Sequence, residues 1–274
     1  MKSLLRQSDY SQEWVKDFYT QAGIWWGEDP QAAGTHQERV QLVERLCGPG
    51  PKRVLDLGCG PGRTVAAMAD AGHTVVGVEL NPTDANYARE LLKTPRKGPV
   101  TFLEADFYTV ELQGPFDVVA CWQIFGFGSD ADQRRLLRRI AQEWLAPEGS
   151  VLLDVYNPAG PARDNGKEWR LAPLKGVPGS VEMIERCHYD PVQGRWIDEW
   201  QPTANPENTL AQTLRCYTPA DLLLLLEGTG LRLERVDIAG EAFDITNNRR
   251  AVIKDDFKND YNYLAQLARE HGYL

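Results

Sequence analysis

The sequence lacks the features of a membrane protein or a secreted protein. Its apolar runs are short, with Leu222–Leu226 among the longest, whereas a membrane-spanning helix needs roughly 20 apolar residues. The opening residues MKSLLRQSDYSQEW contain no apolar stretch of the kind found in signal peptides. The 5 cysteines are odd in number and show no CxxC spacing, which argues against a disulfide framework and against structural zinc. We therefore expect a cytoplasmic protein with no membrane partner and no metal.

An excess of positive charge is also absent. The chain has 30 Lys and Arg against 39 Asp and Glu, which gives a formal net charge of -9 at pH 7. Proteins that bind a nucleic-acid backbone draw most of their affinity from clustered basic side chains. The one dense basic run, residues 134–139, places its arginines around Leu136 and Leu137 at helical spacing, which is typical of the solvent face of an amphipathic helix. Nucleic acid is therefore not an expected partner.

Short apolar runs alternate with helical patterns from residue 31 to residue 156. The pattern predicts strands at residues 53–57, 74–80, 100–105, 116–122 and 150–156, and helices at residues 31–47, 63–71, 82–93 and 130–144. Such alternation is typical of parallel βαβ units. We expect an α/β fold, a Rossmann-like seven-stranded sheet with helices on both faces, together with an inserted antiparallel β lid.

The lid is predicted from a change of pattern after residue 156. Residues 181–189, 195–200 and 212–217 have the period-two character of strands, and residues 190–194 form a hairpin turn. Beyond the lid we expect a helix at 218–227, strands at 231–238 and 250–253, and a terminal helix at 257–271. The expected organisation is an N-terminal aromatic cap segment (1–30), the Rossmann-like core (31–156), the lid (157–217), and a return to the core with a C-terminal helix (218–274).

A glycine-rich turn follows the first predicted strand. Gly58, Gly60 and Gly62 let the backbone turn sharply and let a ligand lie against it, and the next helix offers unpaired N–H groups. A dinucleotide-binding turn needs a third glycine where Arg63 stands, and a nucleotide-binding P-loop needs a lysine that is missing here.

The pattern Asp-x-Gly-x-Gly-x-Gly over residues 56–62 resembles that of class I S-adenosylmethionine (SAM)-dependent methyltransferases, and the similarity spans nearly the whole chain. Residues 125–130 and 216–223 look like those of a bacterial small-molecule subgroup. The resemblance implies methyl transfer from SAM to an oxygen or nitrogen atom of a small molecule, with S-adenosyl-L-homocysteine (SAH) as product, by a monomer or a homodimer. An RNA or protein methyltransferase and a non-catalytic SAM-binding protein are the alternatives.

The resemblance assigns cofactor contacts to the ends of neighbouring strands, which meet at one edge of an open α/β sheet. Glu79 would accept hydrogen bonds from the ribose hydroxyls, and Asp106 from the adenine amino group. We expect Asp56 to orient the glycine loop through its backbone N–H groups. The other expected contacts are Gly58, Cys59 and Gly60 in the loop, Leu80 and Phe107 against adenine, Trp122 beside the methyl group, and Tyr19 and Trp25 from the cap.

The acceptor pocket and a general base are the remaining predictions. In similar enzymes a tyrosine of the N-terminal segment reaches the methionine carboxylate, a role that suits Tyr19; alternatively, the tryptophans of this segment are core residues. A general base is needed only if the acceptor is protonated, and His188 and His36 are the candidates. Trp196, Asp198 and Trp200 share one strand face. The expected acceptor-binding residues are Trp26, Gln123, Phe125, Tyr156, Asn157, Trp196 and Trp200.

Overall fold

The computed structural model of the chain describes residues 13–26, 33–238, 241–245 and 260–270. Its largest unit is an eight-stranded sheet in the order β11-β10-β12-β5-β4-β1-β2-β3. The strands are β1 (Arg53–Leu57), β2 (Thr74–Glu79), β3 (Val100–Glu104), β4 (Phe116–Phe125), β5 (Leu145–Tyr156), β10 (Leu231–Ile238), β11 (Glu241–Asp244) and β12 (Asn262–Arg269). The strands from β3 to β5 run parallel, and β12 runs antiparallel to β5 and β10. The expected α/β class is confirmed, and among the described residues the sheet gains an eighth strand because β11 pairs with β10.

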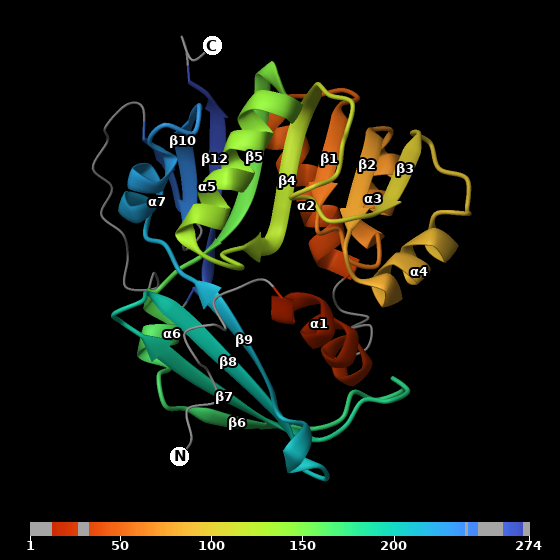
Figure 1. The fold of residues 1–274 in the computed structure, drawn as a ribbon. Helices are drawn as coiled ribbons and strands as arrows, with labels where there is room; N and C mark the ends of the chain where they lie inside the picture. The colour runs from red at the N-terminus through yellow and green to blue at the C-terminus, as the bar shows by residue number, and fades with distance from the viewer. Residues whose placement is uncertain (1–12, 27–32, 239–240, 246–259, 271–274) are drawn as a thin grey trace.

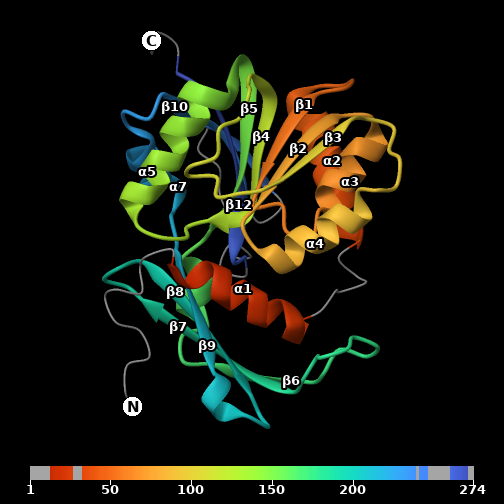
Figure 2. The same ribbon diagram turned by 45° about the vertical axis from the view of Figure 1, so that its right-hand side comes forward.

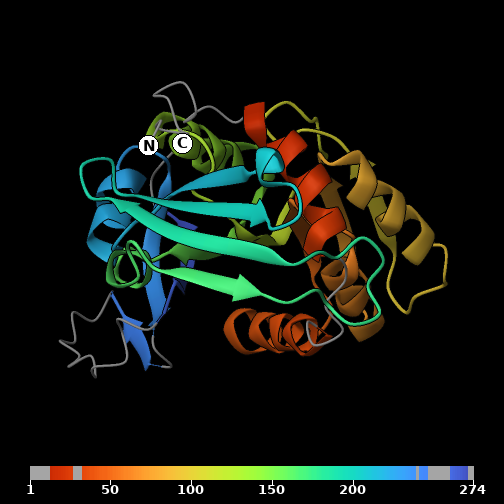
Figure 3. The same cartoon turned by 90° about the horizontal axis from the view of Figure 1, so that it is seen from below.

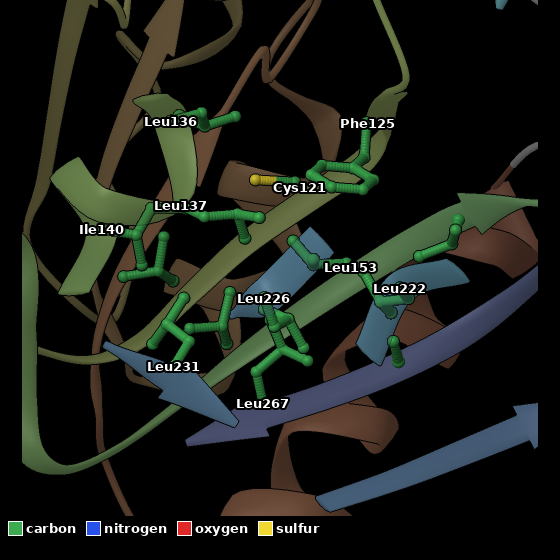
Figure 4. Close-up of a cluster of buried hydrophobic side chains, with 14 of the residues drawn as sticks. Cys121, Phe125, Leu136, Leu137, Ile140, Leu153, Leu222, Leu226, Leu231 and Leu267 are labelled. Carbon is green, nitrogen blue, oxygen red and sulfur yellow. The ribbon is translucent and has the colours of Figure 1, made fainter. Parts of the chain in front are cut away.

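Helices cover both faces of this sheet (Figure 1). Successive strand residues point to opposite faces, so Leu55 and Leu57 enter one core and Val54 enters the other. The first core contains side chains of α5 (Asp130–Arg139), the π-helix η3 (Ile140–Trp144) and α7 (Pro219–Leu226). Figure 4 shows part of this core, with side chains of α5 and α7 meeting those of the central strands. The second core contains side chains of α2 (Ala33–Cys47) and α3 (Arg63–Ala71), while α4 (Pro82–Leu91) packs beside β3.

The sequence predicted a terminal helix at residues 257–271. This prediction is wrong for the part of the segment that the structure describes. Residues 262–269 form β12, a strand in the middle of the sheet. Tyr263, Ala265 and Leu267 are buried against the first core, and Leu264 is buried against the second, so both faces are covered. Alanine, leucine, glutamine and arginine favour helices in isolation, but the two open strand edges of β5 and β10 override this local preference. The strand expected at 250–253 lies outside the described residues.

A second, antiparallel sheet lies between β5 and α7 in the chain. Its strands are β6 (Glu168–Leu171), β7 (Met183–Asp190), β8 (Arg195–Pro202) and β9 (Leu210–Arg215), in the order β6-β7-β8-β9. The short helices α6 (Ala159–Arg163) and η4 (Pro206–Asn208) flank it. The expected antiparallel strands are therefore present. Figure 3 shows this sheet from below, with its strands crossing under the larger sheet.

Helix α1 (Glu13–Trp26) lies between the two sheets (Figures 1 and 2). Phe18 and Ala22 are buried, and Trp14 makes an edge-to-face contact with Phe127, with ring centroids 5.7 Å apart. The helix thus closes the space between the sheets from one side. None of the described helices is both long enough and apolar enough to span a membrane.

The basic run on α5 has a structural use. Arg134 donates hydrogen bonds to the carbonyl oxygens of Leu224 and Glu227, each at 2.9 Å, and Arg138 donates one to Gly228 at 3.4 Å. These carbonyl groups lie at the end of α7, where a helix leaves acceptors without intrahelical donors. Two of the four arginines in the run at residues 134–139 therefore hydrogen-bond α5 to the end of α7, in addition to facing solvent.

Candidate functional site

A cavity of about 1380 Å³ lies between the larger sheet, α1 and the antiparallel sheet. This volume exceeds that of a typical single-ligand pocket. Its walls come from the loops that follow β1, β2, β3 and β4, from α2, and from Trp196 and Gln212 of the smaller sheet. The predicted residues that line it are Tyr19, His36, Gly58, Cys59, Gly60, Glu79, Leu80, Asp106, Phe107, Trp122, Gln123, Tyr156 and Trp196.

The glycine loop forms the floor of the cavity at the end of β1. Gly60 has a φ of 54°, in the left-handed region, and a Cβ placed there would meet no atom within 4 Å. At Gly58 a Cβ would lie 2.7 Å from Cγ2 of Ile124, so this position has no room for a side chain. Gly58 also has a positive φ, of 65°, so the loop needs glycine for its conformation at both positions and for close packing at Gly58 as well.

Glu79 holds this loop in place. Its Oε2 accepts a hydrogen bond from the Gly60 N–H at 2.8 Å, and its Oε1 accepts one from the Asn81 N–H at 2.7 Å. Glu79 is buried, and burial raises the pKa of its carboxyl group, while these backbone hydrogen bonds oppose the rise. Each carboxylate oxygen has a second lone pair, so Glu79 can also accept hydrogen bonds from a ligand.

Asp56 does not orient the glycine loop, contrary to our expectation. Its side chain is 2% exposed and lines the cavity, and neither carboxylate oxygen has a hydrogen-bond partner among the described residues. Burial raises the pKa of Asp56 to about 7; nearby Arg39 opposes this rise and Glu79 adds to it. Buried carboxylates are normally satisfied, so an unpaired one in a cavity wall indicates a cationic or hydrogen-bond-donating ligand.

Arg39 and His36 project from α2 toward the same end of the cavity. Arg39 donates a hydrogen bond to Oγ1 of Thr64 at 3.0 Å, and its guanidinium carbon lies 5.0 Å from the ring centroid of Trp122. Nδ1 of His36 lies 2.9 Å from the same Thr64 oxygen. The pKa of His36 is lowered, first by burial and then by Arg39 and Arg63.

Sequence reasoning missed Arg39. The available signal was the helical spacing that Arg39 shares with His36, Val40 and Val43, which together face the larger sheet. An arginine on the buried face of a helix needs an anionic or aromatic neighbour. Here Asp154 lies 3.9 Å from its Nη2, and the Trp122 ring lies beneath the guanidinium group.

Acidic and aromatic residues line the cavity beyond Glu79. Asp106 accepts a hydrogen bond from the Tyr108 N–H at 2.8 Å, which orients its carboxylate next to Phe107. Asp84, on α4, also lines the cavity, and its pKa is raised to about 7 by burial and by Glu79. This end combines hydrogen-bond acceptors with apolar surface from Leu80 and Phe107.

The opposite end of the cavity has an aromatic wall. Trp196 lies between Tyr156 and Tyr261, with ring centroids 5.8 Å and 4.9 Å away. Gln123 has a φ of 59°, which is unusual outside glycine, and its carbonyl oxygen accepts a hydrogen bond from Oη of Tyr156 at 2.8 Å. Left-handed backbone at a non-glycine residue often occurs at functional sites. Sequence reasoning missed Tyr261 because it fell in a segment predicted to be helical.

Five of the predicted site residues do not line this cavity. Phe125 is fully buried in the first core, as Figure 4 shows, and Trp25 is buried within the fold. Asn157 is buried and donates a hydrogen bond to the Asp260 carbonyl oxygen at 3.0 Å. The Trp200 indole donates one to Oδ2 of Asp198 at 2.6 Å, farther along β8 from Trp196. The fifth is His188, and the Trp26 side chain lies outside the described part of the chain.

His188 lies on the wrong face of the antiparallel sheet to reach the cavity. It pairs with Ile197 in the β7–β8 register, whereas the cavity residue Trp196 pairs with Tyr189. Directly paired residues share a face, and the next residue along each strand points to the other. The expected shared face of Trp196, Asp198 and Trp200 is confirmed by this register, and it is the face opposite His188. Among the described lining residues, His36 is the single histidine.

Three comparisons relate the chain to known proteins. Residues 32–236 match the family model described as "Methyltransferase domain". The ubiquinone biosynthesis O-methyltransferase of Thiobacillus denitrificans is 30% identical over 93% of this chain and 96% of its own length. The CcbJ methyltransferase of Streptomyces caelestis has a similar fold, with a TM-score of 0.67 and 22% identity over 89% of this chain and 97% of that one. The sugar N-methyltransferase KedS8 of Streptoalloteichus sp. also shares the fold, with a TM-score of 0.59 and 22% identity over 98% of each chain.

Proposed function

Because the chain belongs to the methyltransferase-domain family, we propose that the cavity binds SAM beside a small biosynthetic molecule and serves methyl transfer to an oxygen or nitrogen atom of that molecule. The SAM-dependent methyltransferase activity expected from residues 56–62 is confirmed by the family match and by the relatives. The residues that hold each ligand are our proposal, argued below from the cavity.

The observation that carries the proposal is the pair of opposite charges beside the glycine loop. Asp56 is buried without a partner among the described residues, and Arg39 faces the same end of the cavity. The amino-acid end of SAM carries an ammonium group and a carboxylate. We assign the ammonium group to Asp56, which has no hydrogen-bond partner among the described residues, and the carboxylate to Arg39, whose ion pair with Asp154 is long at 3.9 Å.

The nucleoside end of SAM fits the far side of the loop. Glu79 has lone pairs for the two ribose hydroxyls while it holds the loop, and Asp106 can accept from the adenine amino group. Leu80 and Phe107 offer apolar surface for the ring. The open space above Gly60 allows the ligand to lie directly against the backbone.

Bound SAM supplies an activated methyl group on a sulfonium centre. The protein aligns the acceptor atom with this group and excludes water, and alignment alone can provide much of the rate. Trp122, buried between Arg39 and the cavity, offers an electron-rich face near the sulfonium position. Helix α1 and the antiparallel sheet screen the acceptor from solvent.

A histidine general base has little support. His36 is bound to Thr64 beside Arg39, at the end of the cavity that we assign to the amino-acid part of SAM. His188 faces away from the cavity. We propose that the acceptor enters as a neutral amine or as an already ionised hydroxyl group, so that no protein base is required.

A small acceptor suits this site better than RNA or a protein. The aromatic wall of Tyr156, Trp196 and Tyr261 lies beneath the antiparallel sheet, and the chain carries a net charge of -9. The relatives, an O-methyltransferase of ubiquinone biosynthesis and a sugar N-methyltransferase, lead us to test two acceptor classes: phenols for O-methylation and amino sugars for N-methylation.

The experiment is transfer of a labelled methyl group from SAM to a panel of phenols and amino sugars, preceded by calorimetry with SAM and SAH. We expect both cofactor forms to bind and one acceptor class to be methylated. In the calorimetry with SAM and SAH, Asp164→Asn is the control variant, because Asp164 is buried but does not line the cavity, and its partner Tyr261 lies in the wall that we assign to the acceptor. Absence of SAM binding by the parent chain would refute the proposed site, and labelling of RNA or protein alone would refute the small acceptor.

A further inference from the structure

A chain of hydrogen bonds runs from α1 through the wall of the cavity into the antiparallel sheet. Oη of Tyr19 lies 3.0 Å from Oε1 of Gln212, on β9, and Nε2 of Gln212 lies 2.8 Å from Oδ2 of Asp198, on β8. Asp198 is 2% exposed and does not line the cavity, whereas Tyr19 and Gln212 do. The chain therefore links a buried acid to two side chains in contact with the site.

The Trp200 indole fixes the direction of every hydrogen bond in this series. The Trp200 indole N–H, which can only donate, lies 2.6 Å from Oδ2 of Asp198, so this oxygen is an acceptor. Gln212 must then direct its NH₂ group to Asp198 and its carbonyl oxygen to Tyr19. A hydroxyl has a single proton, so Tyr19 donates it to Gln212 and can only accept hydrogen bonds from a ligand.

The Tyr19 hydroxyl makes its hydrogen bond to the antiparallel sheet. Its partner Gln212 pairs with Asp198 in the β8–β9 register, on the sheet face that also carries Trp196. The Tyr19 ring packs against Phe127, with centroids 5.7 Å apart, in the same apolar cluster as Tyr156. These neighbours belong to the end of the cavity that we assign to the acceptor.

We propose that Asp198 is a positioning residue that acts through Gln212 on Tyr19, so that the Tyr19 oxygen accepts a hydrogen bond from an N–H or O–H group of the methyl acceptor. This assignment rests on the proposed function. It differs from the role that the family resemblance implied for Tyr19, because a hydroxyl that donates to Gln212 has no proton for the methionine carboxylate. Arg39 carries that carboxylate instead.

The test compares SAH binding with turnover in Tyr19→Phe, Gln212→Met and Asp198→Leu, a variant of similar size that has no acceptor for Gln212. By calorimetry we expect the SAH dissociation constant of each variant to stay within about twofold of the parent value. For whichever acceptor class the parent chain methylates, kcat/KM for the acceptor should fall about five- to tenfold in each variant, the scale of one hydrogen bond. The double variant Tyr19→Phe with Asp198→Leu should be no slower than Tyr19→Phe alone, since both changes remove the same interaction.

Two results would overturn the assignment. A loss of SAH affinity of about tenfold or more in Tyr19→Phe would place its hydroxyl on the methionine end. Multiplicative losses of kcat/KM in the double variant would show that Asp198 does not act through Tyr19. If thermal unfolding shows that Asp198→Leu is misfolded, the double variant of Tyr19→Phe with Gln212→Met replaces it in the same cycle. Failure of the parent chain to bind SAH is a separate outcome, which would remove the proposed function itself and the inference with it.

Discussion

Replacement of Asp56 by asparagine should make the ligand-free protein more stable and its cofactor binding weaker. The substitution keeps the shape of the side chain and removes its charge. Asp56 is 2% exposed, and neither oxygen has a hydrogen-bond partner among the described residues. A structural carboxylate would show the opposite pattern, because its loss would lower stability and leave the ligand affinity unchanged.

The expected gain in stability follows from the pKa of Asp56. Burial raises it from 3.8 to about 7. The pKa of Asp56 is higher in the folded protein than in the unfolded chain, so protonation of Asp56 favours the folded state. Its contribution to the free energy of unfolding is therefore most favourable below about pH 4 and is lost as the pH rises to about 7. At pH 8 the loss amounts to about 4 kcal/mol, and the buried amide of asparagine costs about 1–3 kcal/mol. Asp56→Asn should therefore gain about 1–3 kcal/mol at pH 8, and the gain should shrink as the pH falls to 5.

The expected loss of affinity comes from the missing partner of the SAM ammonium group. A hydrogen bond to a charged group contributes about 1.5–3 kcal/mol, so the dissociation constant for SAM should rise about 10- to 150-fold. Calorimetry with SAM and urea unfolding at pH 5 and pH 8 measure the two effects on the same protein. Our reasoning fails if Asp56→Asn binds SAM as tightly as the parent, or if its free energy of unfolding at pH 8 decreases.

Asp164→Asn provides the matched contrast. Asp164 is equally buried, but it accepts hydrogen bonds from Lys167 at 2.6 Å and Tyr261 at 2.7 Å and is paired with Arg163. These partners lower the pKa of Asp164 below its value in the unfolded chain. Its charge therefore stabilises the folded protein at any pH above the unfolded pKa, and this contribution is lost as the pH falls through the folded pKa. The same chemical change should therefore decrease stability at pH 8 and leave the SAM affinity within about twofold of the parent value.

The remaining predictions concern the ribose anchor, the excluded histidine and the terminal strand. Glu79→Ala should weaken SAM binding by roughly 1.5–3 kcal/mol, measured by calorimetry, because the variant loses an acceptor for the ribose and for the Gly60 N–H; unchanged affinity would contradict this assignment. His188→Ala should leave kcat and its pH profile unchanged, since the side chain faces away from the cavity; a loss of tenfold would contradict the observed face. Leu267→Ala should lower the free energy of unfolding by about 2–5 kcal/mol in urea, because Leu267 is fully buried on β12; a loss under 1 kcal/mol would argue for an exposed terminal helix.

The local sequence pattern was sufficient to predict the glycine loop and the position of Glu79 at the same sheet edge. The run from Val54 to Leu57 is apolar enough for a buried strand, and the turn needs a left-handed backbone that Gly60 adopts readily. Glu79 comes directly after an apolar strand, so its place at the same sheet edge follows from parallel pairing. The position of the glycine loop and Glu79 at one sheet edge therefore follows from spacing, because these residues lie one βα unit apart.

Strand register lay beyond sequence reasoning. His188 and Tyr189 are adjacent in the chain, but only the pairing of β7 with β8 decides which of them shares a face with Trp196. A shift of one residue would exchange the two faces. The composition of residues 262–269 favours a helix, and only the gap between β5 and β10 makes this segment a strand.

The sequence by itself determined that an α/β sheet carries a glycine loop with an acid one strand away, because those features depend on local backbone preferences and on the repeat of strand and helix. The tertiary structure decided which charges face the cavity. Arg39 and Asp56 come from different elements and come together only when α2 packs against α3 and β4. Tyr19, Gln212 and Asp198 form one hydrogen-bonded chain only when α1 lies against the antiparallel sheet. Burial and hydrogen-bond direction depend on these long-range contacts, and they set the charge and the donor or acceptor character of the site.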